Sequence, residues 1–221
     1  MVSSVSVSQN ISFKEESNKV QPGTRYNAEI VAGALMLTES RQIARRLLDG
    51  VTDSELKKLL VEDNILQKRS PATSLRQAAL IKKRLQLVNG ELLGVIADGT
   101  REVATQALLA AAIKHNKLLG DFMLRVVKEH WLTYERQLKR SDWPRFLEEC
   151  QQIDPTVLTW SKATRQKIGQ VVVRCLIEAR YIDGARSLLI TPVHIYGEVL
   201  DYLRRNDEQY ALACMEIFDE R

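Results

Sequence analysis

Apolar residues recur at intervals of three and four positions along most of the chain, which is the period of an α-helix. We expect helices over residues 28–48 and 71–88, a short helix beginning at Asp53 or Ser54 between them, and further helices over 100–115 and 121–139. The glycines at positions 90, 94 and 99 indicate a turn. Alternating strand patterns are scarce, so the fold class predicted is all-α.

The pair Asp154-Pro155 marks a boundary between two helical units, because the residue before proline disfavours helix. We expect an N-terminal multi-helix bundle over residues 25–153 and a smaller C-terminal helical unit over 154–221. In the second unit the pattern predicts helices over 161–180, 194–204 and 207–218, with one short extended piece at 187–190. Residues 1–24 are predicted to be a flexible arm.

Basic side chains gather in two segments although the net charge is only +4. Residues 64–90 contain six of them and no acid: Lys68, Arg69, Arg76, Lys82, Lys83 and Arg84. Ser70 and Pro71 in this segment are typical of a helix start, and a helix N-terminus beside cations suits phosphate. The second segment places Lys162, Arg165, Lys167 and Arg174 on one expected helix, again without an acid. A merely solvated face explains such charge runs about equally well.

Residues with reactive side chains do not form a recognisable catalytic or metal-binding pattern. His115, His130 and His194 have no partner at ligand spacing, and the sequence holds no phosphate-binding glycine loop and no dinucleotide motif. We therefore predict no enzyme activity, no metal and no cofactor, and interpret the histidines as surface or packing residues. Trp131, Tyr134 and Trp143 are expected in the core, and the three separated cysteines as buried thiols in the cytoplasm. The longest apolar run, residues 107–113, is too short for a membrane span.

Two stretches carry a resemblance to a known family. They are residues 64–73 followed by Arg76-Gln77, and residues 26–35 leading to residues 38–41. Both resemble BrxA, the small A-component of the BREX phage-exclusion systems, and residues 179–183 resemble it more weakly. The resemblance implies a cytoplasmic helical bundle similar to the antitermination factor NusB. It also implies contact with double-stranded DNA and with other BREX proteins.

The residues assigned to nucleic-acid binding rest on two different arguments. Six of them match both the resemblance and the charge pattern: Lys68, Arg69, Ser70, Thr73, Arg76 and Lys83. Four rest on charge alone: Lys162, Arg165, Lys167 and Arg174. The leading hypothesis is a non-catalytic protein that binds duplex DNA with low sequence specificity. A scaffold that docks another BREX component and an RNA-binding protein are the alternatives, and self-association is left open.

Overall fold

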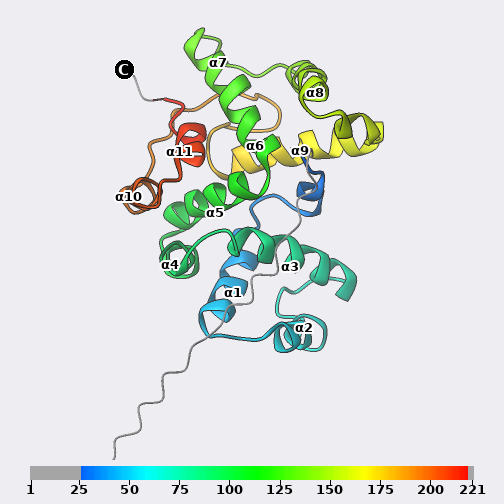
Figure 1. Ribbon diagram of the computed structural model, residues 1–221, viewed down its shortest axis with the longest axis vertical. Coiled ribbons are helices and arrows are strands. Elements are labelled where there is room, and N and C mark those ends of the chain that lie inside the picture. The colour runs from blue at the N-terminus through cyan, green and yellow to red at the C-terminus, as the bar shows by residue number, and fades with distance from the viewer. Residues whose placement is uncertain (1–25, 219–221) are drawn as a thin grey trace, which may run out of the picture.

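The computed structural model describes residues 26–218, so the predicted arm over residues 1–24 lies outside the described residues. The helices appear in Figure 1 and the 3-10 and π turns between them are called η. They are η1 (Glu29–Ala32), α1 (Leu37–Leu48), α2 (Asp53–Val61), α3 (Pro71–Leu85), α4 (Gly90–Asp98), α5 (Arg101–His115), α6 (Lys117–Phe122), η2 (Met123–Val127), α7 (Lys128–Leu132), α8 (Asp142–Ile153), η3 (Pro155–Thr159), α9 (Lys162–Glu178), α10 (Gly197–Arg205) and α11 (Gln209–Met215). Between residues 26 and 218 the β pairing consists of isolated bridges. The all-α fold class is confirmed.

The first predicted helix, residues 28–48, is wrong as a single element, because the chain leaves the helical path between η1 and α1. Met36 has a left-handed backbone with φ of 54°, which no continuous α-helix can contain. The buried Arg84 of α3 donates to the carbonyl oxygens of Gly33 (3.2 Å) and Ala34 in this break. A distant arginine therefore satisfies the backbone that the break exposes.

A helix that the sequence pattern did not predict, α4, follows α3. The predicted basic helix ends at Leu85 rather than residue 88. Asn89 begins the next helix, since its Oδ1 accepts hydrogen bonds from the amides of Glu91 (3.1 Å) and Leu92 (3.3 Å). An Asn-Gly pair is a common stop signal, but asparagine is also a strong N-cap, and here the capping role prevails.

The helix predicted over 121–139 is displaced towards the N-terminus. It begins at Lys117, where the Asn116 side chain accepts from the Leu119 amide at 3.1 Å, and it contains one π turn, η2. It ends at Leu132, and residues 133–141 form a non-helical loop that leads into α8. The last part of the prediction fails because the chain turns at Tyr134, whose φ is 62°.

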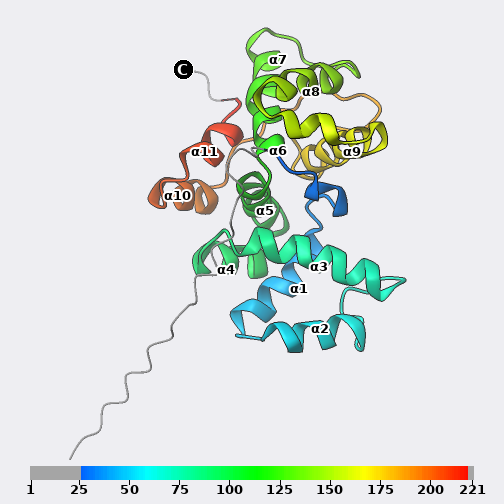
Figure 2. The same ribbon diagram turned by 45° about the vertical axis from the view of Figure 1, so that its right-hand side comes forward.

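The helix α5 lies at the centre of the fold, surrounded by neighbouring helices in both ribbon views (Figure 2). It contacts α1, α3, α4, α6, α10 and α11. The helix is rich in alanine, and five of its alanines are completely buried: Ala104, Ala107, Ala110, Ala111 and Ala112. Small side chains let several helices approach one axis closely. One hydrophobic core includes residues from before and after Asp154.

The C-terminal part has the predicted order of a helix, a short extended piece and two more helices. The extended piece pairs with two segments, through bridges between Ile182 and Ile190 and between Gln137 and Leu189. The second bridge joins it to the loop that precedes α8. Helices α10 and α11 then return to pack on α4, α5 and α6.

Candidate nucleic-acid interface

Two basic helices, α3 and α9, begin with the same capping arrangement. The Ser70 hydroxyl accepts from the Thr73 amide at 3.3 Å, and the two hydroxyls lie 3.0 Å apart. At α9 the Ser161 hydroxyl accepts from the Thr164 amide at 3.1 Å, with the hydroxyls 2.9 Å apart. Neither first turn contains an acidic residue. The positive end of each helix dipole is therefore left without the carboxylate that commonly neutralises it.

Four of the predicted DNA-binding cations are already held by the protein. Lys68 pairs with Glu39, Lys83 with Glu29 at 2.6 Å, and Arg174 with Glu178 at 3.0 Å. The Arg165 guanidinium instead donates to the backbone oxygens of Trp160 and Leu158, each at 3.0 Å. The ion pairs thus partly neutralise Lys68, Lys83 and Arg174, and hydrogen bonds to the backbone hold the Arg165 guanidinium.

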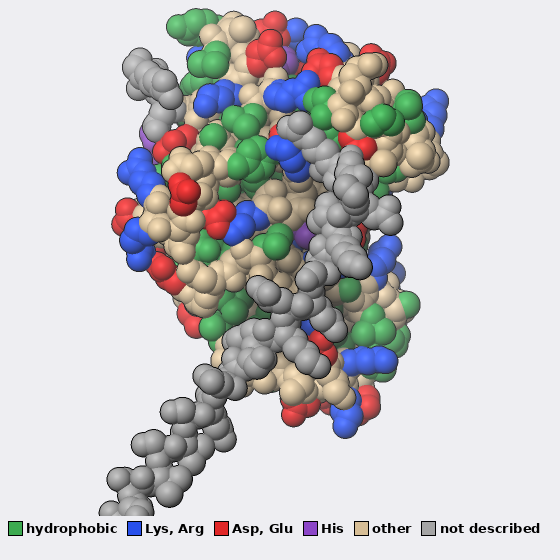
Figure 3. All heavy atoms as spheres, viewed as in Figure 1, with side chains coloured by type: hydrophobic (Ala, Val, Ile, Leu, Met, Phe, Trp, Pro, Cys, Tyr) green, Lys and Arg blue, Asp and Glu red, His purple; other side chains and the backbone are tan. Residues whose placement is uncertain are grey.

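The other four predicted cations, Arg69, Arg76, Lys162 and Lys167, are exposed. Within residues 26–218 no ion pair involves any of them. Figures 1 and 2 show α3 and α9 beginning on the same side of the molecule. Figure 3 shows basic and acidic side chains interspersed over the viewed face rather than one continuous basic patch. The unpaired cations at the two helix starts therefore form a limited set.

The acid-free segment over residues 64–90 carries less free charge than its sequence suggests. Besides Lys68 and Lys83, Lys82 is paired, with Asp53 of α2. Arg84 is only 2% exposed and binds backbone carbonyls. Of its six cations, Arg69 and Arg76 remain exposed without an ion pair among the described residues.

A hollow of about 410 Å³ lies between the two basic segments. Its lining includes Lys68 from before α3 and Arg174 from α9, together with their partners Glu39 and Glu178. Arg101 at the start of α5 adds a further positive charge. The structure thus brings two of the predicted residues to one hollow, where each is matched by a carboxylate.

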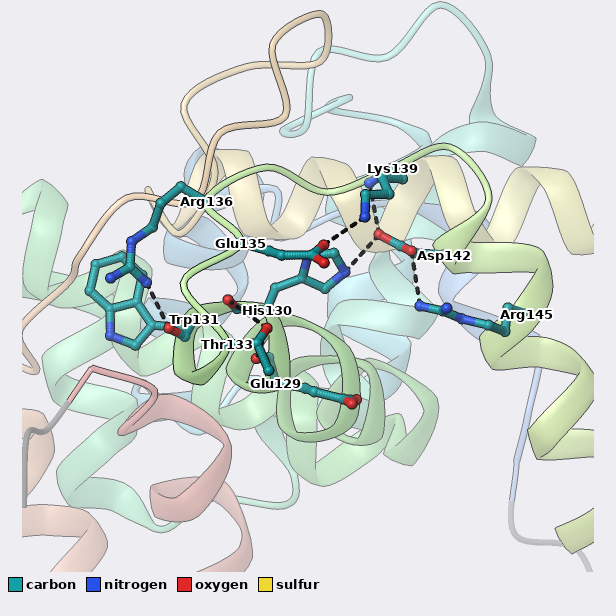
Figure 4. Close-up of polar contacts among 9 residues, drawn as sticks. All are labelled: Glu129, His130, Trp131, Thr133, Glu135, Arg136, Lys139, Asp142 and Arg145. Carbon is teal, nitrogen blue, oxygen red and sulfur yellow. Dashed lines mark hydrogen bonds and ion pairs between the residues drawn. The ribbon is translucent and has the colours of Figure 1, made fainter.

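A polar cluster that surrounds the buried His130 near the end of α7 was not predicted from the sequence. The His130 cluster consists of His130, Glu135, Lys139, Asp142 and Arg145 (Figure 4). His130 is 6% exposed and lies between two carboxylates, with Nε2 3.0 Å from Asp142 and Nδ1 3.2 Å from Glu135. The Asp142 carboxylate also accepts from the Lys139 amide at 2.7 Å. The partners come from the loop after α7 and from the start of α8, so the spacing along α7 alone could not reveal them.

His115 also has a partner, Glu29, at 3.0 Å from its Nε2. Burial, with the charges of Arg84 and Lys83, lowers the pKa of His115 and outweighs the opposite effect of Glu29. His115 and His130 thus have acidic partners on other elements, which the spacing along their own helices could not show. His194 is exposed.

Tyr134 contradicts its predicted place in the core, because it is 82% exposed. Trp131 and Trp143 are partly buried against the core, as expected. The three cysteines are buried thiols, and burial raises their pKa values, to about 11 for Cys150.

Nowhere in residues 26–218 do three or more His, Cys, Asp or Glu side chains gather as a metal site would require. No helix in this part of the chain is long and apolar enough to cross a membrane.

The fold and the site define an all-helical protein with exposed cations at the starts of two capped helices. The family model described as BrxA matches residues 24–207, and the chain belongs to the BrxA family. It is 42% identical over 193 residues to "BREX protein BrxA" of Paramagnetospirillum magneticum, covering 87% of this chain and 97% of that protein. It is 29% identical to "BREX protein BrxA" of Escherichia coli over 188 residues, covering 85% and 88% of the two chains.

A solved structure has the same fold. It is described as an uncharacterized protein from Magnetospirillum magneticum and is 40% identical to this chain, with a TM-score of 0.81. The match covers 88% of this chain and all of the other. The likeness to NusB remains a prediction.

Proposed function

We propose that this chain is a non-catalytic component of a cytoplasmic BREX anti-phage system and that it binds double-stranded DNA with low sequence specificity. Family membership supports the first part, since the relatives are named as BREX proteins. Other BREX proteins are its expected partners.

The proposal that the chain binds DNA rests on one observation: the starts of α3 and α9 present exposed cations that have no ion pair among the described residues. Arg69 precedes α3 and Arg76 lies in its second turn, while Lys162 is the first residue of α9 and Lys167 lies in its second turn. The capped, acid-free first turns add the positive ends of two helix dipoles. Such groups bind phosphate oxygens, which are the same in every DNA sequence, so the contact positions the protein without reading bases.

The number of unpaired cations fixes the salt dependence. Each neutralised phosphate contributes about −0.9 to the slope of log K against log salt for duplex DNA. Four contacts therefore give a slope of roughly −3.6. Lys68, Lys83 and Arg174 are expected to add little, because DNA must first compete with their carboxylates.

The test is fluorescence anisotropy of a labelled random-sequence duplex at several salt concentrations. Two double variants each remove two charges: Arg69→Gln with Arg76→Gln, and Lys162→Gln with Lys167→Gln. Each is expected to make the slope shallower by about 1.8. The control removes the same amount of charge from two ion-paired arginines, by Arg204→Gln with Arg205→Gln on α10; they pair with Glu216 and Glu91. This helix lies on the opposite side of the molecule from the starts of α3 and α9 in Figure 1.

Equal slopes for the wild-type protein and both helix-start variants would refute this binding surface. Absence of duplex binding at low salt would instead favour the scaffold that docks another BREX component. Competition by RNA that exceeds competition by duplex DNA would favour the RNA-binding alternative.

A further inference from the structure

The loop between α7 and α8 exposes an aromatic ring beside a stacked arginine. Tyr134 is 82% exposed and sits in a left-handed conformation that a tyrosine rarely adopts. The Arg136 guanidinium lies 3.5 Å from the centre of the Trp131 ring and 5.3 Å from that of Tyr134. It also donates to the Trp131 carbonyl oxygen at 2.7 Å. Figure 4 shows Arg136 over the Trp131 ring.

Both sides of this loop are held in place. The His130 cluster ties the end of α7 to the start of α8. The middle of the loop pairs with the extended piece, where the Leu138 amide donates to the Leu188 carbonyl at 3.0 Å and the Ile190 amide to that of Arg136 at 2.8 Å. The exposed ring therefore sits on a fixed support and loses little conformational freedom when a ligand binds.

Two further arginines lie at the end of these paired segments that is farther from Tyr134. The antiparallel register places Arg140 and Arg186 beyond the Leu138–Leu188 pair, on the same end. Both are exposed and have no ion pair among the described residues. Of the nearby acids, Glu135 is paired with Lys139, whereas Asp183 accepts a hydrogen bond from the Ser187 hydroxyl and keeps its charge.

We propose that Tyr134 stacks on an unpaired nucleobase of a single-stranded nucleic acid, while Arg140 and Arg186 contact its phosphates. Proteins that bind single strands combine an exposed aromatic face with cations along the backbone. A base inside a duplex is already stacked on both faces, so this site selects single strands or frayed ends. Arg136 beside the ring has no ion pair among the described residues, and Arg140 and Arg186 lie further along the paired segments, so this surface favours a polyanion over a protein partner. The site is separate from the starts of α3 and α9.

The test uses the full chain and a short oligothymidine that carries one 2-aminopurine, whose fluorescence falls when it stacks on an aromatic ring. The wild-type protein is expected to quench the probe. Tyr134→Ala is expected to abolish the quenching and weaken binding by about 5- to 150-fold, the range for loss of one stacked base. Tyr134→Phe retains the ring and is expected to retain both.

The control is Tyr196→Ala, which removes another tyrosine with substantial exposure, 43%. Circular dichroism checks that each variant is folded. The double variant of Arg69 and Arg76 is expected to quench the probe like the wild type, so failure of the duplex surface is distinguishable from failure of this site. Wild-type protein that does not quench the probe overturns the proposal, as does equal binding by Tyr134→Ala. Either result would leave the loop as a surface for a protein partner.

Discussion

Arg84 is the cation of the acid-free segment whose removal should destabilise the fold most. Its guanidinium is buried and binds the carbonyl oxygens of Gly33 and Ala34, in the break between η1 and α1. Arg84→Met keeps most of the side-chain volume but leaves both carbonyl groups without their donor. A hydrogen bond to a charged group contributes about 1.5–3 kcal/mol, and relief from burying the charge offsets part of the loss. We expect a net destabilisation of about 3 kcal/mol.

The assay is thermal unfolding followed by circular dichroism, with urea unfolding for the free energy. For a chain of this size, 3 kcal/mol corresponds to a fall in Tm of about 6–12 °C. Arg84→Lys should be intermediate, because one ammonium group cannot reproduce the planar fork of donors. Arg76→Met, at an exposed position on the same helix, is the control and should change stability by less than about 0.5 kcal/mol. Equal stability of the Arg84→Met and Arg76→Met variants would refute the structural role.

Three further changes test the local structure. Replacing either cap, Ser70→Ala or Ser161→Ala, removes a side-chain acceptor and should cost about 1 kcal/mol in urea unfolding; no loss would contradict the capping geometry. Gly169→Ala would place a Cβ 2.6 Å from the Trp143 ring. We expect the free energy of unfolding to fall by about 1–3 kcal/mol and the tryptophan fluorescence emission to shift. Unchanged emission would contradict the contact. The pKa of His115 is lowered in the fold, so as the pH drops the unfolded chain binds the proton of His115 before the folded chain does. The free energy of unfolding should therefore fall below about pH 6.5, and His115→Gln should flatten that fall. A pH profile that the substitution leaves unchanged would contradict this role of His115.

The helices that local sequence signals specify were predicted well. Ser70 and Ser161 cap α3 and α9, and Thr100 caps α5 by accepting from the Val103 amide at 3.4 Å. Each of these signals lies within three residues of the group it satisfies. The all-α class follows from such signals and from the helical period of the apolar residues.

The failures of prediction come from interactions between distant segments. The break after η1 depends on Arg84, about 50 positions away. An arginine that follows two lysines in the sequence gives no sign that it is buried. The exposure of Tyr134 depends on pairing between its loop and the extended piece at 187–190. A helical period continues through residue 138, so the pattern alone could not locate the turn.

The candidate site shows the same limitation for charge. Lys68, Lys82 and Lys83 stand in a segment without acids, yet Glu39, Asp53 and Glu29 reach them from α1, α2 and η1. A local count of charges cannot include these partners, so it overestimates the field that a phosphate would meet. Among the predicted DNA-binding cations, those left without an ion pair in residues 26–218 are Arg69, Arg76, Lys162 and Lys167, in or near the first two turns of helices whose first turn has no acid. Free charge and helix dipole therefore coincide at the starts of α3 and α9, which makes these two positions, rather than the whole basic segments, the places to test for DNA contact.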